Sequence, residues 1–99
     1  MSRNKYRITQ KGLEDLDKIW IYTFNKWSKE QADRYYDLII EEIRFIADNF
    51  LIGKSIEQTR KNYRVSKVKS HLNFFKKDEN NTVEIVRILH QRMDIKNRL

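Results

Sequence analysis

The sequence predicts an α+β fold in which an N-terminal strand leads into an antiparallel helical hairpin, followed by three strands. Three observations predict this β-α-α-β-β-β order. Apolar residues recur at spacings of three and four over residues 10–27 and 32–50, as in two amphipathic helices. Strand-like runs cover residues 5–8, 63–68, 70–77 and 83–89. We therefore expect the hairpin to pack on a mainly antiparallel four-stranded sheet, in a single domain over residues 1–99.

The first strand and helix come from residues 5–27. Polar and apolar residues alternate through Tyr6 and Ile8, and Thr9 is a suitable N-cap for a helix beginning at Gln10. We expect Trp20 to lie in the core, because it is central in the apolar stripe. The stripe consists of Leu13, Leu16, Trp20, Phe24 and Trp27, with Ile19 adding width.

The second helix begins at a strong local signal. Ser28 and Gln31 fit a capping box, and Trp27 and Ala32 occupy the hydrophobic-staple positions beside it. Since the connection is so short, the two helices must be antiparallel. Gly53 is the expected stop beyond the second helix. The predicted seam is Ala32, Tyr35, Tyr36, Ile39, Ile43, Ile46, Ala47 and Phe50.

The remaining chain predicts an antiparallel three-stranded meander. Residues 54–62 lose apolar periodicity and gain charge, which indicates a surface connection. Residues 63–68 have mixed polarity, so we expect an edge strand or an open sheet face. Residues 78–81 favour a turn before the last strand, and residues 91–99 are a tail whose Met93, Ile95 and Leu99 can dock as a final turn.

The last strand organises the prediction. Val83 and Ile85 have one parity and Val86 and Ile88 the other, so both faces should be covered. Arg87 must then emerge on an open face or be paired, because an unpaired buried guanidinium is too costly.

Polar residues with candidate binding or structural roles lie at the end of the last strand and just after it. His90 either contacts a partner or satisfies a backbone carbonyl, whereas His71 is better explained as the cap of a turn. Arg92 and Asp94 are close enough in sequence to form an ion pair that locks the tail.

The net charge of +7 is concentrated in one quarter of the chain. Residues 54–77 contain eight lysines and arginines against Glu57, whereas cations and carboxylates balance on either side of this segment. Such a segment attracts a polyanion or an acidic protein. The alternative is a solvated strand edge whose lysines prevent aggregation.

Several classes of protein are disfavoured. The sequence has no cysteine and two separated histidines, so we expect no metal and no cofactor. It contains neither a bilayer-spanning apolar run nor a signal-type N-terminus, so we expect a cytoplasmic protein without a membrane partner.

The chain resembles the ParE-type toxins of the RelE/ParE toxin–antitoxin superfamily over residues 6–94. The resemblance rests on segments 13–23 (LEDLDKIWIYT), 27–32 (WSKEQA), 70–75 (SHLNFF) and 88–94 (ILHQRMD), of which the last is the most specific. Similar proteins often have a proline shortly before Gly53, and this chain has none.

The resemblance implies the toxic component of a type II toxin–antitoxin system, which causes growth arrest and plasmid stabilisation. It implies inhibition of DNA gyrase, which can carry bound DNA, and neutralisation by a ParD-like antitoxin in a hetero-oligomer. We predict a recognition surface on the open sheet face and strand end, and no catalytic residues. Its residues are Arg64, Lys67, Arg87, His90 and Arg92. The alternative is a RelE-like ribosome-dependent mRNA endonuclease using His90 with Arg87 and Arg92.

Overall fold

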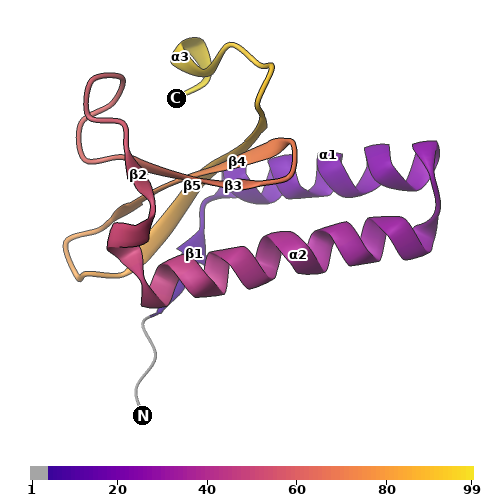
Figure 1. The fold of residues 1–99 in the computed structure, drawn as a ribbon, viewed down its shortest axis with the longest axis horizontal. Coiled ribbons are helices and arrows are strands. Elements are labelled where there is room, and N and C mark those ends of the chain that lie inside the picture. The colour runs from indigo at the N-terminus through magenta and orange to yellow at the C-terminus, as the bar shows by residue number, and fades with distance from the viewer. Residues whose placement is uncertain (1–4) are drawn as a thin grey trace.

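The computed structural model describes residues 5–99 and has an α+β fold. An antiparallel pair of helices, α1 (Gln10–Lys26) and α2 (Lys29–Asp48), covers one face of a sheet (Figure 1). The strands are β1 (Tyr6–Ile8), β2 (Lys54–Ser55), β3 (Arg64–Val68), β4 (His71–Lys77) and β5 (Val83–His90). Two short helical segments complete the fold, η1 (Phe50–Ile52) and α3 (Ile95–Arg98).

The sheet has the order β1-β5-β4-β3-β2. The predicted meander is confirmed, because β3, β4 and β5 pair antiparallel in sequence order. The strand β1 pairs parallel with β5, which makes the sheet mixed. The prediction of four strands was wrong, since Lys54 and Ser55 pair with β3 as a fifth strand. A two-residue strand arises from that pairing and leaves no alternation to read in the sequence.

A β-bulge changes which face the last strand presents. Phe74 pairs with Arg87, but the next residue, Phe75, pairs with Ile85, so Val86 is an extra residue in β5. As a result, Ile88 joins Val83 and Ile85 in the core beneath the helices. The prediction that both faces of β5 are covered is correct, but simple alternation placed Ile88 on the wrong face.

The sheet has a core on each side. Helix-side core residues include Leu16, Ile39, Ile43, Ile46, Phe75, Val83, Ile85 and Ile88. On the opposite face, Tyr63, Phe74 and Leu89 form a second cluster. Residues packing against it are Ile56, Val65, Leu72, Val86, Ile95 and Leu99. The predicted open sheet face is therefore wrong, because the loop after β2 and the C-terminal tail cover it.

The buried side of α1 differs from the predicted stripe. Its buried residues are Gly12, Asp15, Leu16 and Ile19. Leu13 and Phe24 are more than two-fifths exposed, and Trp20 is half-buried with its indole N–H donating to Asp33 Oδ1 at 2.9 Å. The prediction that Trp20 is a core residue was wrong. At about 100° per residue, the buried side is rotated by roughly 80° from the predicted one.

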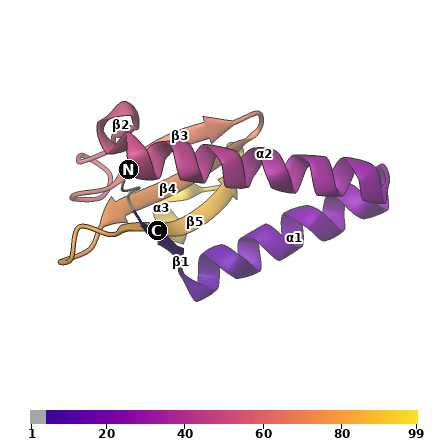
Figure 2. The same cartoon turned by 90° about the horizontal axis from the view of Figure 1, so that it is seen from below.

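Both predicted helix starts are confirmed. Thr9 Oγ1 accepts from Gly12 N–H, and Ser28 Oγ accepts from Gln31 N–H. The helices meet at this connection and diverge toward β1 (Figure 2). Gly53 does not end α2, which stops at Asp48. Instead a Cβ at Gly53 would overlap the Phe75 ring, so glycine is needed for close packing.

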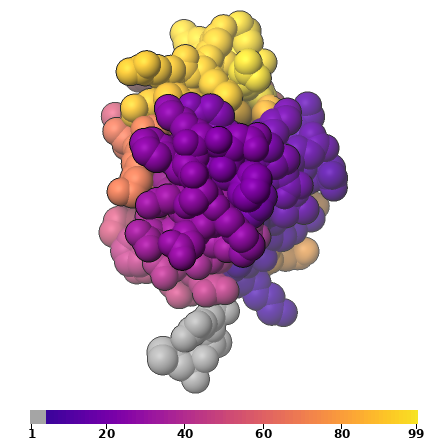
Figure 3. Space-filling model, turned by 90° about the vertical axis from the view of Figure 1, so that its right-hand side faces the viewer, coloured from indigo at the N-terminus to yellow at the C-terminus, as the bar shows by residue number. Residues whose placement is uncertain are grey.

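The two remaining connections behave largely as predicted. In the turn before β5, Asn81 has φ 62°, while Asp78 Oδ1 accepts from the N–H groups of Asn80 and Thr82. In the tail, Ile95 and Leu99 dock on the second cluster, whereas Met93 stays 42% exposed. The space-filling view onto the hairpin shows the C-terminal segment of the chain, in yellow, above it (Figure 3). Within residues 5–99, no helix has the length and apolar character needed to cross a membrane.

The face of α1 that is buried can be tested by two substitutions. Leu16→Ala should lower the free energy of unfolding by about 3 kcal/mol, because it opens a cavity in the core. Trp20→Ala should lower it by about 1–2 kcal/mol, because it removes a surface hydrogen bond and a ring stack on Phe24. Urea unfolding measures both values. A Trp20→Ala variant that loses more stability than Leu16→Ala would contradict this orientation of α1.

Candidate functional site

β1 pairs with β5 only as far as Ile85, and the start of α1 covers the edge of β5 beyond that residue. Thr9 N–H donates to Ile85 O at 3.0 Å, and Thr9 Oγ1 donates to Val86 O at 2.8 Å. Gly12 permits this close approach, because a Cβ there would lie 2.8 Å from Ile8 Cγ2 and 3.1 Å from Ile85 O. Thr9 therefore caps the start of α1 and also donates to two backbone carbonyl oxygens of β5.

Asp15 completes this closure with an ion pair. Its carboxylate accepts from Arg87 Nε at 2.7 Å, from Arg87 Nη2 at 2.9 Å and from Ile88 N–H at 3.0 Å. Asp15 is 7% exposed, and the hydrogen bond with it raises the pKa of the Arg87 guanidinium. The remaining Arg87 Nη1 donates to Arg98 O at 3.0 Å. Of the two alternatives for Arg87, the structure therefore shows the paired one.

A cluster of three rings lies beneath the hairpin, where β4 begins and β5 ends. His71 and His90 are paired across the strands, with ring centroids 5.2 Å apart and edge-to-face. Tyr35 of α2 donates its hydroxyl to Val68 O at 3.2 Å and shares a 2.6 Å hydrogen bond with His71 Nδ1. Because a hydroxyl has one proton, Nδ1 donates whenever that proton points to Val68.

Burial changes the acidity of this cluster. Burial, and to a smaller extent the neighbouring His90, lower the pKa of His71 from 6.5 to about 4. Burial also raises the pKa of the Tyr35 hydroxyl. At neutral pH, His71 is therefore an uncharged imidazole held by a protonated phenol.

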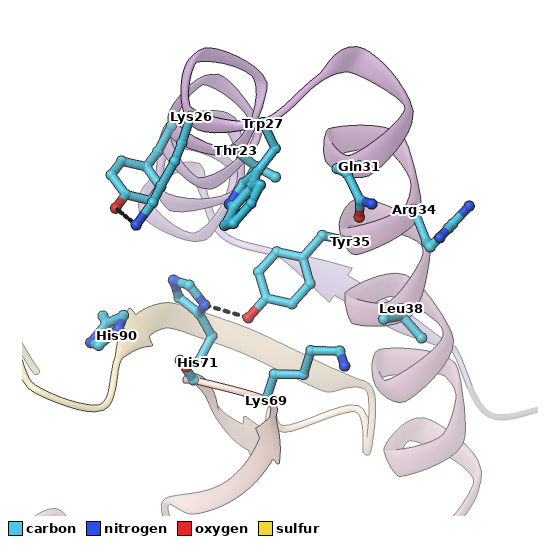
Figure 4. Close-up of a pocket in the computed structure, with 12 residues that line it drawn as sticks. Thr23, Lys26, Trp27, Gln31, Arg34, Tyr35, Leu38, Lys69, His71 and His90 are labelled. Carbon is cyan, nitrogen blue, oxygen red and sulfur yellow. Dashed lines mark hydrogen bonds between the residues drawn. The ribbon is translucent and has the colours of Figure 1, made fainter.

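A cleft of about 620 Å³ opens beside this cluster, between the hairpin connection and the β3–β4 turn. We call it the hairpin-tip cleft. Tyr35 and His71 point toward each other inside it, Trp27 projects from the helix connection, and Lys69 lies on the sheet side (Figure 4). The other lining residues are Tyr22, Thr23, Lys26, Gln31, Arg34, Leu38, Ser70 and His90.

The five predicted recognition residues do not form one surface. Arg64 lies over the Phe50 ring and donates to the carbonyl oxygen of Gly53. Lys67 is exposed and pairs with Leu72, whose side chain packs on the second cluster, so Lys67 faces away from the helices. Arg87 is held by Asp15.

The other two predicted residues lie at the end of β5. His90 faces the hairpin, and its Nδ1 accepts from Arg92 N–H at 3.1 Å. Arg92 is exposed. The ion pair expected between Arg92 and Asp94 is not among the salt bridges of residues 5–99, and Asp94 accepts instead from Asn97 Nδ2 at 2.5 Å. His71 caps no turn but belongs to the ring cluster.

Sequence reasoning missed Asp15, Tyr35 and Lys69 as site residues. Asp15 had a signal, because an arginine in an apolar strand needs a carboxylate and Asp15 is beside Leu16 on the helix. Tyr35 and Lys69 had none, since their position depends on how α2 and the β3–β4 turn meet. Within residues 5–99, no group of three or more His, Cys, Asp or Glu side chains could hold a metal ion.

Comparisons with known proteins agree on one family. Residues 6–95 match the family model described as the ParE toxin of the type II toxin–antitoxin system parDE. The chain is 32% identical over 92 residues to Toxin ParE1 of Mycobacterium tuberculosis, covering 93% of this chain and 94% of the relative. It is 36% identical over 89 residues to Toxin ParE1 of Caulobacter vibrioides, covering 90% and 91%.

A solved structure shows the same fold. A chain of the chromosomal ParDE TA system from P. aeruginosa superposes with a TM-score of 0.77 at 18% sequence identity. The superposition covers 88% of this chain and 95% of the other.

The closure of β5 predicts a large effect at Asp15. Asp15→Ala should lower the free energy of unfolding by about 3 kcal/mol, because it leaves Arg87 and the Ile88 N–H without their acceptor. Asp15→Asn retains one acceptor oxygen and should cost about half as much. Urea unfolding of both variants measures this, and an Asp15→Ala protein within about 0.5 kcal/mol of the unmodified chain would contradict the assigned role.

The ring cluster predicts a pH dependence. The unfolded chain binds a proton on His71 near pH 6.5, whereas the folded chain binds it near pH 4. The free energy of unfolding should therefore fall as pH drops through this interval, by about 1–2 kcal/mol for this partly exposed ring. His71→Gln should remove that component from the pH profile. His90→Gln should retain part of it, because burial still acts on His71, and identical profiles for His71→Gln and the unmodified protein would refute the assignment.

Proposed function

The chain belongs to the ParE toxin family of type II toxin–antitoxin systems, and we propose that it inhibits DNA gyrase and is neutralised by a ParD-like antitoxin. In this proposal it acts in the cytoplasm, causes growth arrest as a binding protein, and is held in a hetero-oligomer until the antitoxin is lost. The family match over residues 6–95 is the observation that carries the proposal.

Charge supports both proposed partners. Residues 54–77 carry eight cationic side chains and one carboxylate. Exposed cations in this segment are Lys54, Arg60, Lys61, Lys67, Lys69 and Lys77. An acidic antitoxin segment or a gyrase complex with bound DNA is attracted by this field.

The predicted recognition residues divide into two roles under this proposal. Lys67, His90 and Arg92 are the candidates for direct contact, because Lys67 and Arg92 are exposed and His90 lines the hairpin-tip cleft. Arg64 and Arg87 act through the fold, since backbone carbonyls and Asp15 hold their guanidinium groups. Replacing Arg87 would therefore change stability as well as recognition.

One observation favours the endonuclease as a second candidate. The edge-to-face pair of His71 and His90 puts two imidazoles beside each other at an open cleft, where proton transfer to and from a ribose phosphate is chemically reasonable. One observation disfavours the endonuclease. Arg87 is ion-paired with Asp15, so its guanidinium is not available to hold a phosphate next to His90 and Arg92.

A paired assay separates the two functions. The purified chain is added to gyrase supercoiling of plasmid DNA and to a cell-free translation reaction. Gyrase inhibition predicts loss of supercoiling with linearised plasmid and normal translation. Blocked translation with cleaved message and unaffected supercoiling would overturn the proposal and make the histidine pair catalytic.

A matched pair of variants tests the proposed contact in the same assay. Arg92→Ala should weaken gyrase inhibition by about fivefold, because it removes an exposed cation at the strand end. Lys96→Ala removes an exposed cation from α3 and serves as the control. Equal inhibition by Arg92→Ala and the unmodified chain would remove Arg92 from the recognition surface.

A further inference from the structure

The hairpin-tip cleft has a distinctive charge. Among the described residues, its lining includes Lys26, Arg34 and Lys69 but no carboxylate. The hollow on the outer side of α2 is the opposite, because four carboxylates line it and Arg34 is its single cation. In Figure 4, Arg34 points away from the hairpin-tip cleft, and Lys26 Nζ donates to the Tyr22 hydroxyl at 3.3 Å, so Lys69 is the cation best placed to bind an anion inside it. The cleft is therefore suited to an anionic group.

Lys69 occupies an unusual backbone position. It lies in the two-residue connection between β3 and β4, and its φ is 52°. Glycine and asparagine adopt this left-handed conformation most readily, whereas a lysine there is strained. Residues that break a local rule in this way are concentrated at functional sites. The turn places this cation at the cleft in spite of its backbone preference.

Aromatic rings supply the second half of the site. Trp27 is 68% exposed and Tyr22 is 62% exposed, although both line the cleft. Lys26 Nζ lies 5.6 Å from the Tyr22 ring centroid and 5.8 Å from that of Trp27. Large exposed rings interleaved with cations are the arrangement by which proteins bind unpaired bases and their phosphates. An acidic peptide would use the cations and leave the rings without a role.

The size and surroundings of the cleft favour a single strand over a duplex. A volume of about 620 Å³ is in the range of small-ligand sites and is suitable for one nucleotide. Beyond its pairing with β2 at Arg64 and Val65, β3 continues as an open edge that carries the exposed Lys67. Because Lys67 faces away from the helices, it lies on the other face of the sheet from the cleft, and the proposed site is limited to one nucleotide.

We propose that the hairpin-tip cleft binds one unpaired nucleotide of a single-stranded nucleic acid, with Lys69 on the phosphate and Trp27 stacked on the base. This proposal does not rest on gyrase inhibition, because nucleotide binding is measured with the toxin alone.

Tryptophan fluorescence tests the base contact directly. The chain has two tryptophans, so Trp20→Phe leaves Trp27 as the sole indole. Adding oligothymidylate of about eight nucleotides should quench that fluorescence, because a stacked base is a quencher. The matched Trp27→Phe protein, which retains Trp20 outside the cleft, should show no change. An unchanged Trp27 signal at saturating oligonucleotide would overturn the proposal.

Charge reversal tests the phosphate contact. Lys69→Glu should weaken oligothymidylate binding by about tenfold at low salt. Lys61→Glu makes the same change of charge at an exposed residue outside the cleft lining, and should have a much smaller effect. Equal weakening by the two variants would mean that the whole basic segment binds and would overturn the cleft assignment.

Two competitors test the class of ligand. Thymidine monophosphate should bind more weakly than oligothymidylate. An octaglutamate peptide should not displace oligothymidylate from the protein. Thymidine monophosphate that binds as tightly as the oligomer would overturn the single-strand assignment in favour of a free nucleotide. Octaglutamate that displaces the oligomer and loses affinity in Lys69→Glu would identify the cleft as an acidic-peptide site.

Discussion

The carboxylate of Asp15 is the constraint on which the rest of the structure depends. It accepts three hydrogen bonds from β5, two from Arg87 and one from the Ile88 N–H, at a place where β1 no longer covers the strand. An exposed strand edge must be paired or covered, and here a helix side chain does it. A partly buried ion pair adds little net stability compared with apolar residues, but its geometry fixes how two elements meet. Asp15 thereby fixes the rotation of α1 about its own axis relative to the sheet.

That rotation has consequences for both faces of α1. The row containing Gly12, Asp15, Leu16 and Ile19 turns inward, so the broader apolar row with Trp20 and Phe24 turns outward. The bulge at Val86 acts together with this rotation. It places the side chain of Ile88 under the helix, and the backbone N–H of the same residue donates to Asp15. Together the two features place the end of β5 beneath the hairpin and bring His90 against His71.

The sequence predicted the fold more completely than the site. Both N-caps, the hairpin, the meander and the seam residues Ile39, Ile43 and Ile46 follow from period and capping chemistry, which are local. The face of α1 did not follow, because hydrophobicity alone favours the tryptophan row over a row containing an aspartate. A bulge has no reliable sequence signal, so the face of Ile88 was not predictable. The site depends on these non-local features, and the predicted set of Arg64, Lys67, Arg87, His90 and Arg92 was accordingly divided among several places.

The exposed aromatic rings are explained by the same constraint. A helix whose most apolar row faced the sheet would bury Trp20 and also Trp27, which belongs to the same row. With Asp15 facing β5, the connection between the helices instead presents Trp27 at the rim of a cleft whose floor is the Tyr35, His71 and His90 cluster. Exposing such rings forgoes the burial of apolar area that would stabilise a small fold. The left-handed Lys69 on the opposite wall carries a similar cost. Two independent local costs at one cleft, on elements far apart in sequence, are better explained by ligand binding there than by the packing of the fold.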